Sequence, residues 1–178
     1  MNEGLALCEK LEQAREKYER LAAAQEKATA ERNKKKRELM RYFGAHIETC
    51  RKLFDTESTA YSALGLRGKR ETKIEGIIAQ VKKFYNTALA DPEIQNVLMQ
   101  VNLDTAKLQH GLDLLQELLD LETKQKAAMA EKEEARAEQV KQRRFNEKWF
   151  STCKTVAKHA FVDRPHLMEI LDVKVETE

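Results

Sequence analysis

Two long segments of this chain contain neither glycine nor proline, and they restrict its fold more than any other feature. They are Leu5–Phe43 and Leu112–Arg164. With six glycines and two prolines in 178 residues, tight turns are too rare for a β-sandwich, a β-barrel or a glycine-rich nucleotide fold. Since 35% of the residues are charged and 6% are aromatic, the composition is that of long helices. We therefore predict an all-α, elongated helical bundle.

Hydrophobic periodicity and capping signals place the helices. A 4-3 apolar stripe runs through residues 5–54 and is interrupted in the middle by polar residues, which predicts one long helix. Asp104 can cap a second long helix over 104–161, and Thr72 with Glu75 forms a capping box for a central helix over 73–90. Asp91-Pro92 reads as N-cap and first helical position. Short helices are expected at 57–64, 92–101 and 165–171.

An internal pseudo-repeat relates the two long helices. A shift of 107 positions places Tyr42-Phe43 on Trp149-Phe150 and Phe54 on Phe161. We expect one helical-bundle domain over 1–178, with repeat-like units 1–66 and 108–173 around a central segment 73–103. Both Phe54 and Phe161 should be buried, and the core should lie near 42–66, 74–89 and 149–173. The direction in which the long helices pair remains open.

Charge and cysteine content exclude several classes of protein. The net charge is +2, close to balance, which argues against a dedicated nucleic-acid binder. No run of about 18 apolar residues is present, and the N-terminal segment lacks the pattern of a secretory signal, so we expect no membrane insertion. Three widely spaced cysteines in a helical chain form no disulfide framework, and we therefore expect a cytoplasmic location.

A small set of soft ligands is the first candidate site. His46 and Cys50 are four residues apart on one helix face, and Cys153 takes the position of His46 under the repeat. If the long helices bring them together, the three side chains would make an N/S site that zinc or copper accepts. The alternative is that all three simply pack within the bundle.

Clusters of basic residues are the second candidate. The linker after Leu66 resembles a phosphate-binding loop only superficially, because it lacks the first glycine and the Ser or Thr of a Walker motif. It could still hold an anion at a helix start, and two further clusters at 34–41 and 141–148 coincide under the repeat. A solvated helix surface is the competing interpretation. The candidate anion-binding residues are Arg67, Lys69, Arg70, Lys73, Lys34, Arg37, Lys141 and Arg144.

No enzyme signature accompanies these clusters. The serines Ser58, Ser62 and Ser151 lie outside any nucleophile-elbow motif. No histidine follows an acidic residue by three positions within a continuous helix, as a di-iron bundle requires. We expect no cofactor and no catalytic residue.

Three segments carry a resemblance to other proteins. They are Tyr61–Leu66, with its Ala-Leu-Gly-Leu run before a basic linker, Phe84–Leu89 and Phe161–Val173. In these segments the chain resembles a group of uncharacterised prokaryotic all-helical bundle proteins. The resemblance implies a helical architecture and no activity.

The leading hypothesis is a non-enzymatic helical interaction or scaffold module that self-associates, most simply as a coiled-coil homodimer. A thin helix pair has too little core to cover every apolar stripe, and a second subunit usually covers the remainder. The leucines at 5–11 and at 112–119 are the expected contact patches. Polyanion or nucleic-acid binding through 34–41, 67–73 and 141–148 is the alternative, and a metal-binding bundle is a weaker one.

Overall fold

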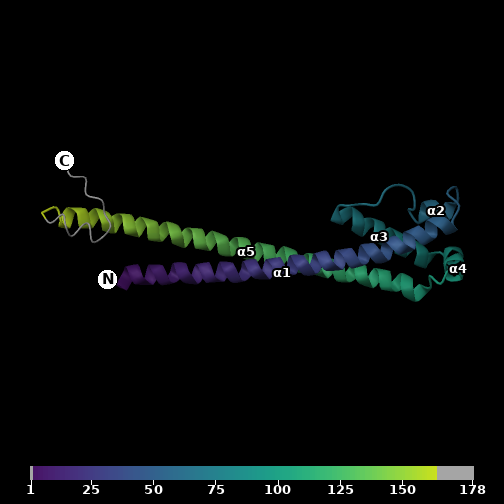
Figure 1. Ribbon diagram of the computed structural model, residues 1–178, viewed down its shortest axis with the longest axis horizontal. Coiled ribbons are helices and arrows are strands. Elements are labelled where there is room, and N and C mark those ends of the chain that lie inside the picture. Colours follow the sequence, from purple (N-terminus) through teal and green to yellow (C-terminus); the bar gives the residue numbers. More distant parts are fainter. Residues whose placement is uncertain (1, 164–178) are drawn as a thin grey trace. The chain divides into compact units, whose positions relative to one another are not determined.

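The computed structural model describes residues 2–163, and in this part of the chain all regular structure is helical (Figure 1). The all-α prediction is confirmed, and both long helices lie close to their predicted limits. The expected helix at 165–171 lies outside the described residues. The helices are α1 (Asn2–Leu53), α2 (Thr59–Ala63), α3 (Ile74–Ala90), α4 (Pro92–Gln100) and α5 (Thr105–Ala160).

The chain divides into two compact units. Of the described residues, unit 1 comprises 2–25 and 128–163, and unit 2 comprises 26–127. Helices α1 and α5 therefore contribute to both units, whereas α2, α3 and α4 belong to unit 2 alone. These divisions do not follow the repeat-like units 1–66 and 108–173, because contacts join the start of α1 to the end of α5.

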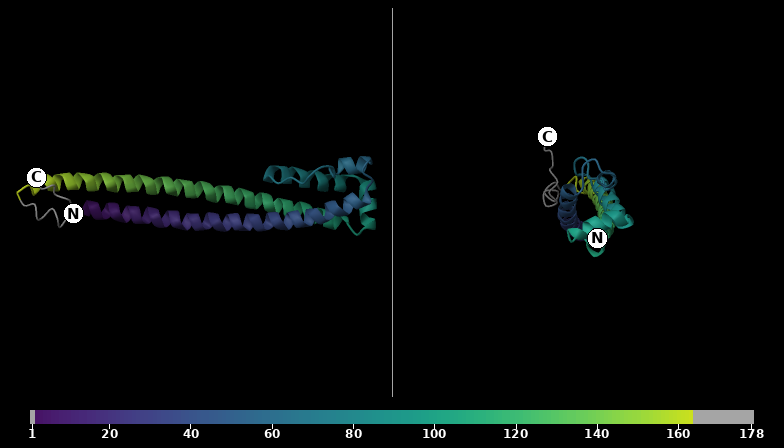
Figure 2. Two further views of the ribbon diagram at one scale, coloured as in Figure 1. Left: turned by 45° about the horizontal axis from the view of Figure 1, so that its top comes forward. Right: turned by 90° about the vertical axis from the view of Figure 1, so that its right-hand side faces the viewer.

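Ion pairs fix the direction of the helix pair in unit 2. Arg32 Nε lies 3.0 Å from Glu122 Oε2, and Lys35 Nζ lies 2.6 Å from Glu117 Oε2. The contact between Arg32 and Glu122 is an ion pair, but its geometry is not that of a hydrogen bond. As residue numbers rise along α1 they fall along α5, so the two segments are antiparallel. In the left view of Figure 2, the colours of the two segments run in opposite directions along the pair.

The helix pair of unit 1 is antiparallel as well. Lys132 Nζ donates to Gln25 Oε1 at 3.3 Å. At the other end, the ring of Trp149 packs on the backbone of Gly4, where an added Cβ would lie 2.8 Å from Trp149 Cζ2. The direction that the sequence left open is thus the antiparallel one in each unit.

The core of unit 2 forms where α3 covers the pair of α1 and α5. Phe43 and Phe84 meet edge to face with ring centroids 5.5 Å apart, and Tyr85 packs on the backbone of Gly111. The helix predicted over 73–90 turns one apolar face inward, and its residues Ile77, Val81, Phe84, Tyr85 and Ala88 are all buried. Three helices around one stripe can remove it from water on every side.

The described residues of unit 1 form a much thinner core. For 149–163 this corrects the expectation of a core near 149–173, and the part of that range after residue 163 lies outside the described residues. Among the described residues of unit 1, only Gly4, Ala14 and Ala135 are buried, while Trp149 and Phe161 are half-buried. Two helices cover each other along a narrow seam only, so larger side chains remain partly in water. The expectation that Phe54 and Phe161 are both buried is wrong, since both side chains are half-buried. Phe54 packs at the edge of the unit 2 core.

The leucines after Gly111 also lie elsewhere than expected. Leu114, Leu115 and Leu118 are buried inside unit 2, at 2%, 4% and 0% exposure. They form part of the core around α3 and do not offer a contact patch to a second subunit. The sequence could not distinguish the two cases, because a helix stripe looks the same whichever neighbour covers it.

Side chains cap the N-termini of α2, α4 and α5, but not that of α3. Asp91 accepts from the backbone N–H groups of Glu93 and Ile94, and Asp104 accepts from that of Lys107. Ser58 caps α2. The predicted capping box at Thr72 is wrong: the N-cap of α3 is Lys73, whose side chain makes no capping bond.

These caps give a paired stability prediction. We expect Asp91→Ala to reduce the free energy of unfolding by about 1 kcal/mol, because two amide groups at the start of α4 lose their acceptor. Thr72→Ala should change it by less than about 0.5 kcal/mol, as an exposed residue away from a cap usually does. Urea unfolding followed by circular dichroism measures both. Equal losses in the two variants would contradict this assignment of the caps.

Candidate functional site

A cluster of rings surrounds His46 in the interior of unit 2. His46 Nδ1 lies 3.1 Å from the hydroxyl of Tyr85, and its ring meets Tyr42 edge to face. The Tyr42 hydroxyl donates to the backbone carbonyl of Lys107 at 3.0 Å. In the tautomer with its proton on Nε2, His46 accepts from Tyr85. The imidazole is thus held by a hydrogen bond between α1 and α3.

Burial controls the protonation of this cluster. It lowers the pKa of His46 to about 4, with a smaller contribution from the charge of Lys107. Burial also raises the pKa of Cys50 to about 12, and it raises the pKa of Tyr85, with Tyr42 and Cys50 adding to the effect. At neutral pH the imidazole is neutral and both the thiol and the phenol keep their protons. Cys50 therefore has none of the thiolate character that metal binding or nucleophilic attack needs.

The three residues predicted as a metal site do not form one in the described structure. His46 and Cys50 belong to unit 2, and the hydrogen bond to Tyr85 occupies the Nδ1 atom of His46. Cys153 belongs to unit 1 and is exposed. Across residues 2–163, no group of three His, Cys, Asp or Glu side chains is placed to hold a metal ion. Packing, the alternative interpretation, explains His46 and Cys50, whereas Cys153 is exposed.

The buried imidazole predicts a loss of stability in acid. Because the pKa of His46 is about 4 in the folded chain and 6.5 when unperturbed, the unfolded chain binds more protons between these values. Stability is therefore full above about pH 6.5 and falls as the pH drops towards 4, by about 2 kcal/mol after allowance for partial exposure of the ring. His46→Gln, which still offers Tyr85 a polar partner, should lose this component. Urea titrations of both proteins across the range measure the difference, and parallel curves would contradict it.

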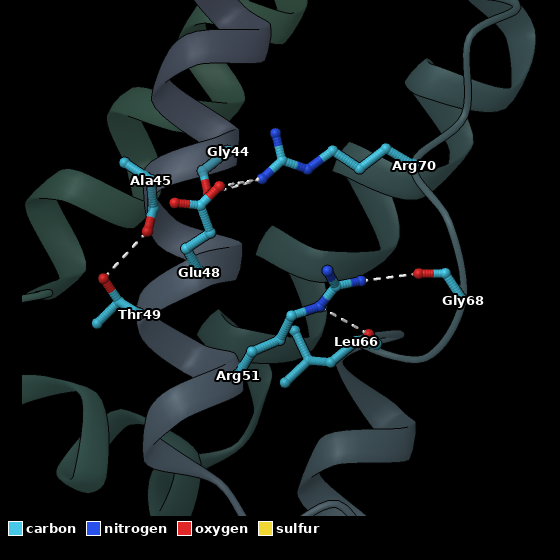
Figure 3. A network of polar contacts seen from close by, with 8 residues as sticks. All are labelled: Gly44, Ala45, Glu48, Thr49, Arg51, Leu66, Gly68 and Arg70. Carbon is cyan, nitrogen blue, oxygen red and sulfur yellow. Dashed lines mark hydrogen bonds and ion pairs between the residues drawn. The ribbon is translucent and has the colours of Figure 1, made fainter.

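The basic linker after α2 is fastened to α1 (Figure 3). Arg70 Nη2 donates to Glu48 Oε1 at 2.7 Å and to the Gly44 carbonyl at 3.3 Å. From the other side, Arg51 donates to the carbonyls of Leu66 and Gly68 at 3.0 and 2.8 Å. α1 continues unbroken through Gly44, whose missing Cβ leaves room for the Arg70 guanidinium. Arg51, which sequence reasoning missed, therefore has a structural role like that of Arg70.

The other candidate anion-binding residues are spread over the two units. In unit 2, Arg67 contacts Glu57 at 3.8 Å, Lys73 is the N-cap of α3, and Lys34, Arg37 and Lys69 lie on α1 or the linker. In unit 1, Lys141 lies 3.8 Å from Glu138, and Arg144 is exposed. The linker arginines are engaged by backbone and carboxylate groups, so the linker is not a free phosphate loop. Arg144 remains available to a partner.

Unit 1 carries a surface that the sequence did not single out. Two adjoining hollows of about 460 and 240 Å³ lie between the starting turns of α1 and the end of α5. Cys8 and Asn146 line both, so they form one groove, which we call the unit 1 groove. The Oδ1 atom of Asn146 is buried and has no hydrogen-bond partner among the described residues. No spacing pattern in the sequence indicates this groove, because its lining residues come from two segments that are far apart in the chain.

Large apolar side chains are exposed beside the groove. Phe145, Phe150 and Val156 on α5 are 54%, 55% and 61% exposed, and Leu5 on α1 is 67% exposed. Within the described part of unit 2, the large exposed hydrophobic residues are Met99 and Val101. Exposed apolar groups thus gather on unit 1, which is also the unit with the thin core.

No protein-family model matches the chain, and no curated protein and no solved structure matches it either. None of the helices in residues 2–163 is long and apolar enough to cross a membrane. The candidate site therefore rests on the groove and the exposed side chains of unit 1.

Proposed function

We propose that the protein is a non-enzymatic helical interaction or scaffold module that self-associates through unit 1. The observation that carries this proposal is the unequal distribution of apolar groups. Unit 2 buries its large side chains around α3, whereas unit 1 leaves Phe145, Phe150 and Val156 in water. Grouped exposed hydrophobic side chains are typical of surfaces that bind another protein.

The chemistry of the buried groups supports a non-enzymatic role. His46, Cys50 and Tyr85 are buried with their ionisation suppressed, and they bond or pack with each other. Exposed Cys8 and Cys153 lie on unit 1. A catalytic centre would need an acid, base or nucleophile poised near neutral pH in a cleft. The unit 1 groove instead combines apolar and carboxylate side chains, as a protein-binding groove does.

Sedimentation equilibrium of the full chain at micromolar concentrations tests self-association. We expect a species heavier than the 20.6 kDa monomer. Phe150→Glu should shift the equilibrium to monomer, because a charge replaces an exposed contact group of unit 1. Met99→Glu is the matched control: Met99 is 51% exposed but lies on α4 in unit 2, and this variant should assemble like the wild type. A monomer at all concentrations would overturn the proposal.

Polyanion binding through 34–41, 67–73 and 141–148 is the competing function. The specific observation in its favour is that Lys141, Arg143, Arg144 and Lys148 lie exposed within two turns of α5. Retention on heparin that falls steeply with added salt would support it. Because Arg70 and Arg51 fasten the linker to α1, the 141–148 cluster should account for most of any such retention.

A further inference from the structure

The unit 1 groove combines apolar and acidic side chains. Its apolar part is formed by Leu7, Leu11 and Phe150, and one rim carries Glu12, Glu16 and Glu19 on successive turns of α1. Arg15 pairs with Glu19, with Nε 2.8 Å from Oε1. Glu12 and Glu16 make no ion pair among the described residues. The groove therefore has an apolar surface with two carboxylates beside it that can bind a basic ligand.

A ligand that fits this groove is a helix with an apolar side chain between basic ones. The end of α5 carries such a face, which we call the basic face: Phe145 and Val156 are exposed and eleven residues apart, which places them on one side of the helix. Arg144 and Lys148 flank Phe145 and are exposed. The charge and apolar content of the basic face complement those of the groove.

The basic face cannot fill the groove of its own unit. Phe145 precedes the groove residue Phe150 by five positions, which is about 140° around the helix. The groove residue Asn146 lies about 100° from Phe145, and Trp149, whose ring packs on Gly4, lies between them. The basic face and the groove therefore look in different directions within unit 1. A symmetric two-fold contact would require each copy to turn both its groove and its basic face toward the other. Because the two look in different directions, two copies cannot fill each other's grooves in this way.

We propose that the unit 1 groove binds the basic face of a second copy of this chain, formed by Phe145, Val156, Arg144 and Lys148, in a head-to-tail contact. This inference rests on the proposed self-association and specifies its geometry. Each bound pair leaves one groove and one basic face unused, so the contact repeats and builds chains or rings of more than two subunits. Added salt should weaken the contact, since it screens the carboxylate and basic groups.

Two variants that each disable one side of the contact test the proposal. The groove variant is Glu12→Lys with Glu16→Lys, and the face variant is Phe145→Lys. All three residues are exposed, so both variants should keep the helical content of the wild type in circular dichroism. Each variant alone should need at least about tenfold more protein for half-assembly. The groove variant keeps an intact basic face, and the face variant keeps an intact groove.

Mixing the two variants gives the decisive result. We expect a terminated 1:1 heterodimer, because the remaining groove and face can join once and the lysine groove repels the lysine face. Glu3→Lys with Glu9→Lys controls for the charge change on α1, and Met129→Lys controls for loss of an exposed apolar residue on α5; both should assemble like the wild type.

Three outcomes would overturn the head-to-tail contact while self-association stands. They are wild-type assembly by either variant alone, a mixture that stays monomeric, and loss of assembly by a chain ending at Asp163 while Phe145→Lys still assembles. The last outcome would show that assembly needs residues 164–178 and does not need the basic face. A wild-type chain that is monomeric throughout would instead refute the proposed function itself.

Discussion

Gly111→Ala should destabilise unit 2 by about 3 kcal/mol or more, although alanine normally stabilises a helix interior by about 1 kcal/mol relative to glycine. A methyl group at this position would overlap the ring of Tyr85, with Cε1 and Cε2 both at 2.5 Å. Tyr85 is fully buried, packs against Phe43 and Phe84, and is bonded to His46, so its ring has no free space to enter. The measurement is urea unfolding followed by far-UV circular dichroism.

Gly76→Ala is the control for this prediction. Gly76 also lies in a helix, but an added methyl group there would meet the side chain of Glu71, which is exposed and can move away. We expect this variant to be as stable as the wild type or more stable by up to about 1 kcal/mol. A Gly111→Ala protein as stable as the Gly76→Ala protein would show that α3 does not pack on α5 in this way.

Phe84→Ala should reduce the free energy of unfolding by about 3–5 kcal/mol, whereas Phe145→Ala and Phe150→Ala should each change it by less than about 1 kcal/mol. Phe84 is fully buried between Phe43 and Tyr85, and its removal leaves a cavity among rigid rings. The other two side chains are more than half exposed in the single chain. The contrast is a direct measure of how unevenly the core is divided between the units.

Concentration matters for this comparison, because self-association would stabilise unit 1. The three variants are best compared at the lowest concentration that circular dichroism allows. Fluorescence of Trp149, the one tryptophan of the chain, reports on unit 1 separately. Similar losses for Phe84→Ala and Phe150→Ala in dilute protein would contradict the assignment of the core to unit 2.

Local sequence signals predicted the helices well. The 4-3 stripe of residues 5–54 identified α1, and its positions from Leu7 to Leu39 are indeed half-buried or buried. Asp91 and Asp104 were identified as caps because a short carboxylate beside a helix start has one favourable use. The capping box predicted at Thr72 was wrong, because Lys73 takes the N-cap position of α3. The linker before it is held to α1 by hydrogen bonds of Arg51 and Arg70.

The candidate sites were harder to predict, because they depend on which segments meet. His46 and Cys50 share a helix face as expected, but the structure adds Tyr85 from α3 and turns a possible ligand pair into part of a buried ring cluster. The groove on unit 1 needs residues 4–19 and 146–150 together. No spacing within either segment indicates the other.

The sequence by itself determined the all-α class, the limits of α1 and α5, and the stripe that each helix turns inward. These features depend on hydrogen bonds and side-chain spacing within a few turns of one helix. Only the tertiary structure decided that the helix pairs are antiparallel, that Leu114 and Leu118 are covered by unit 2, and that Trp149 remains half-exposed. An apolar stripe must be buried by other helices, but the stripe does not determine which ones. Its burial depends on the number and direction of the helices that pack on it.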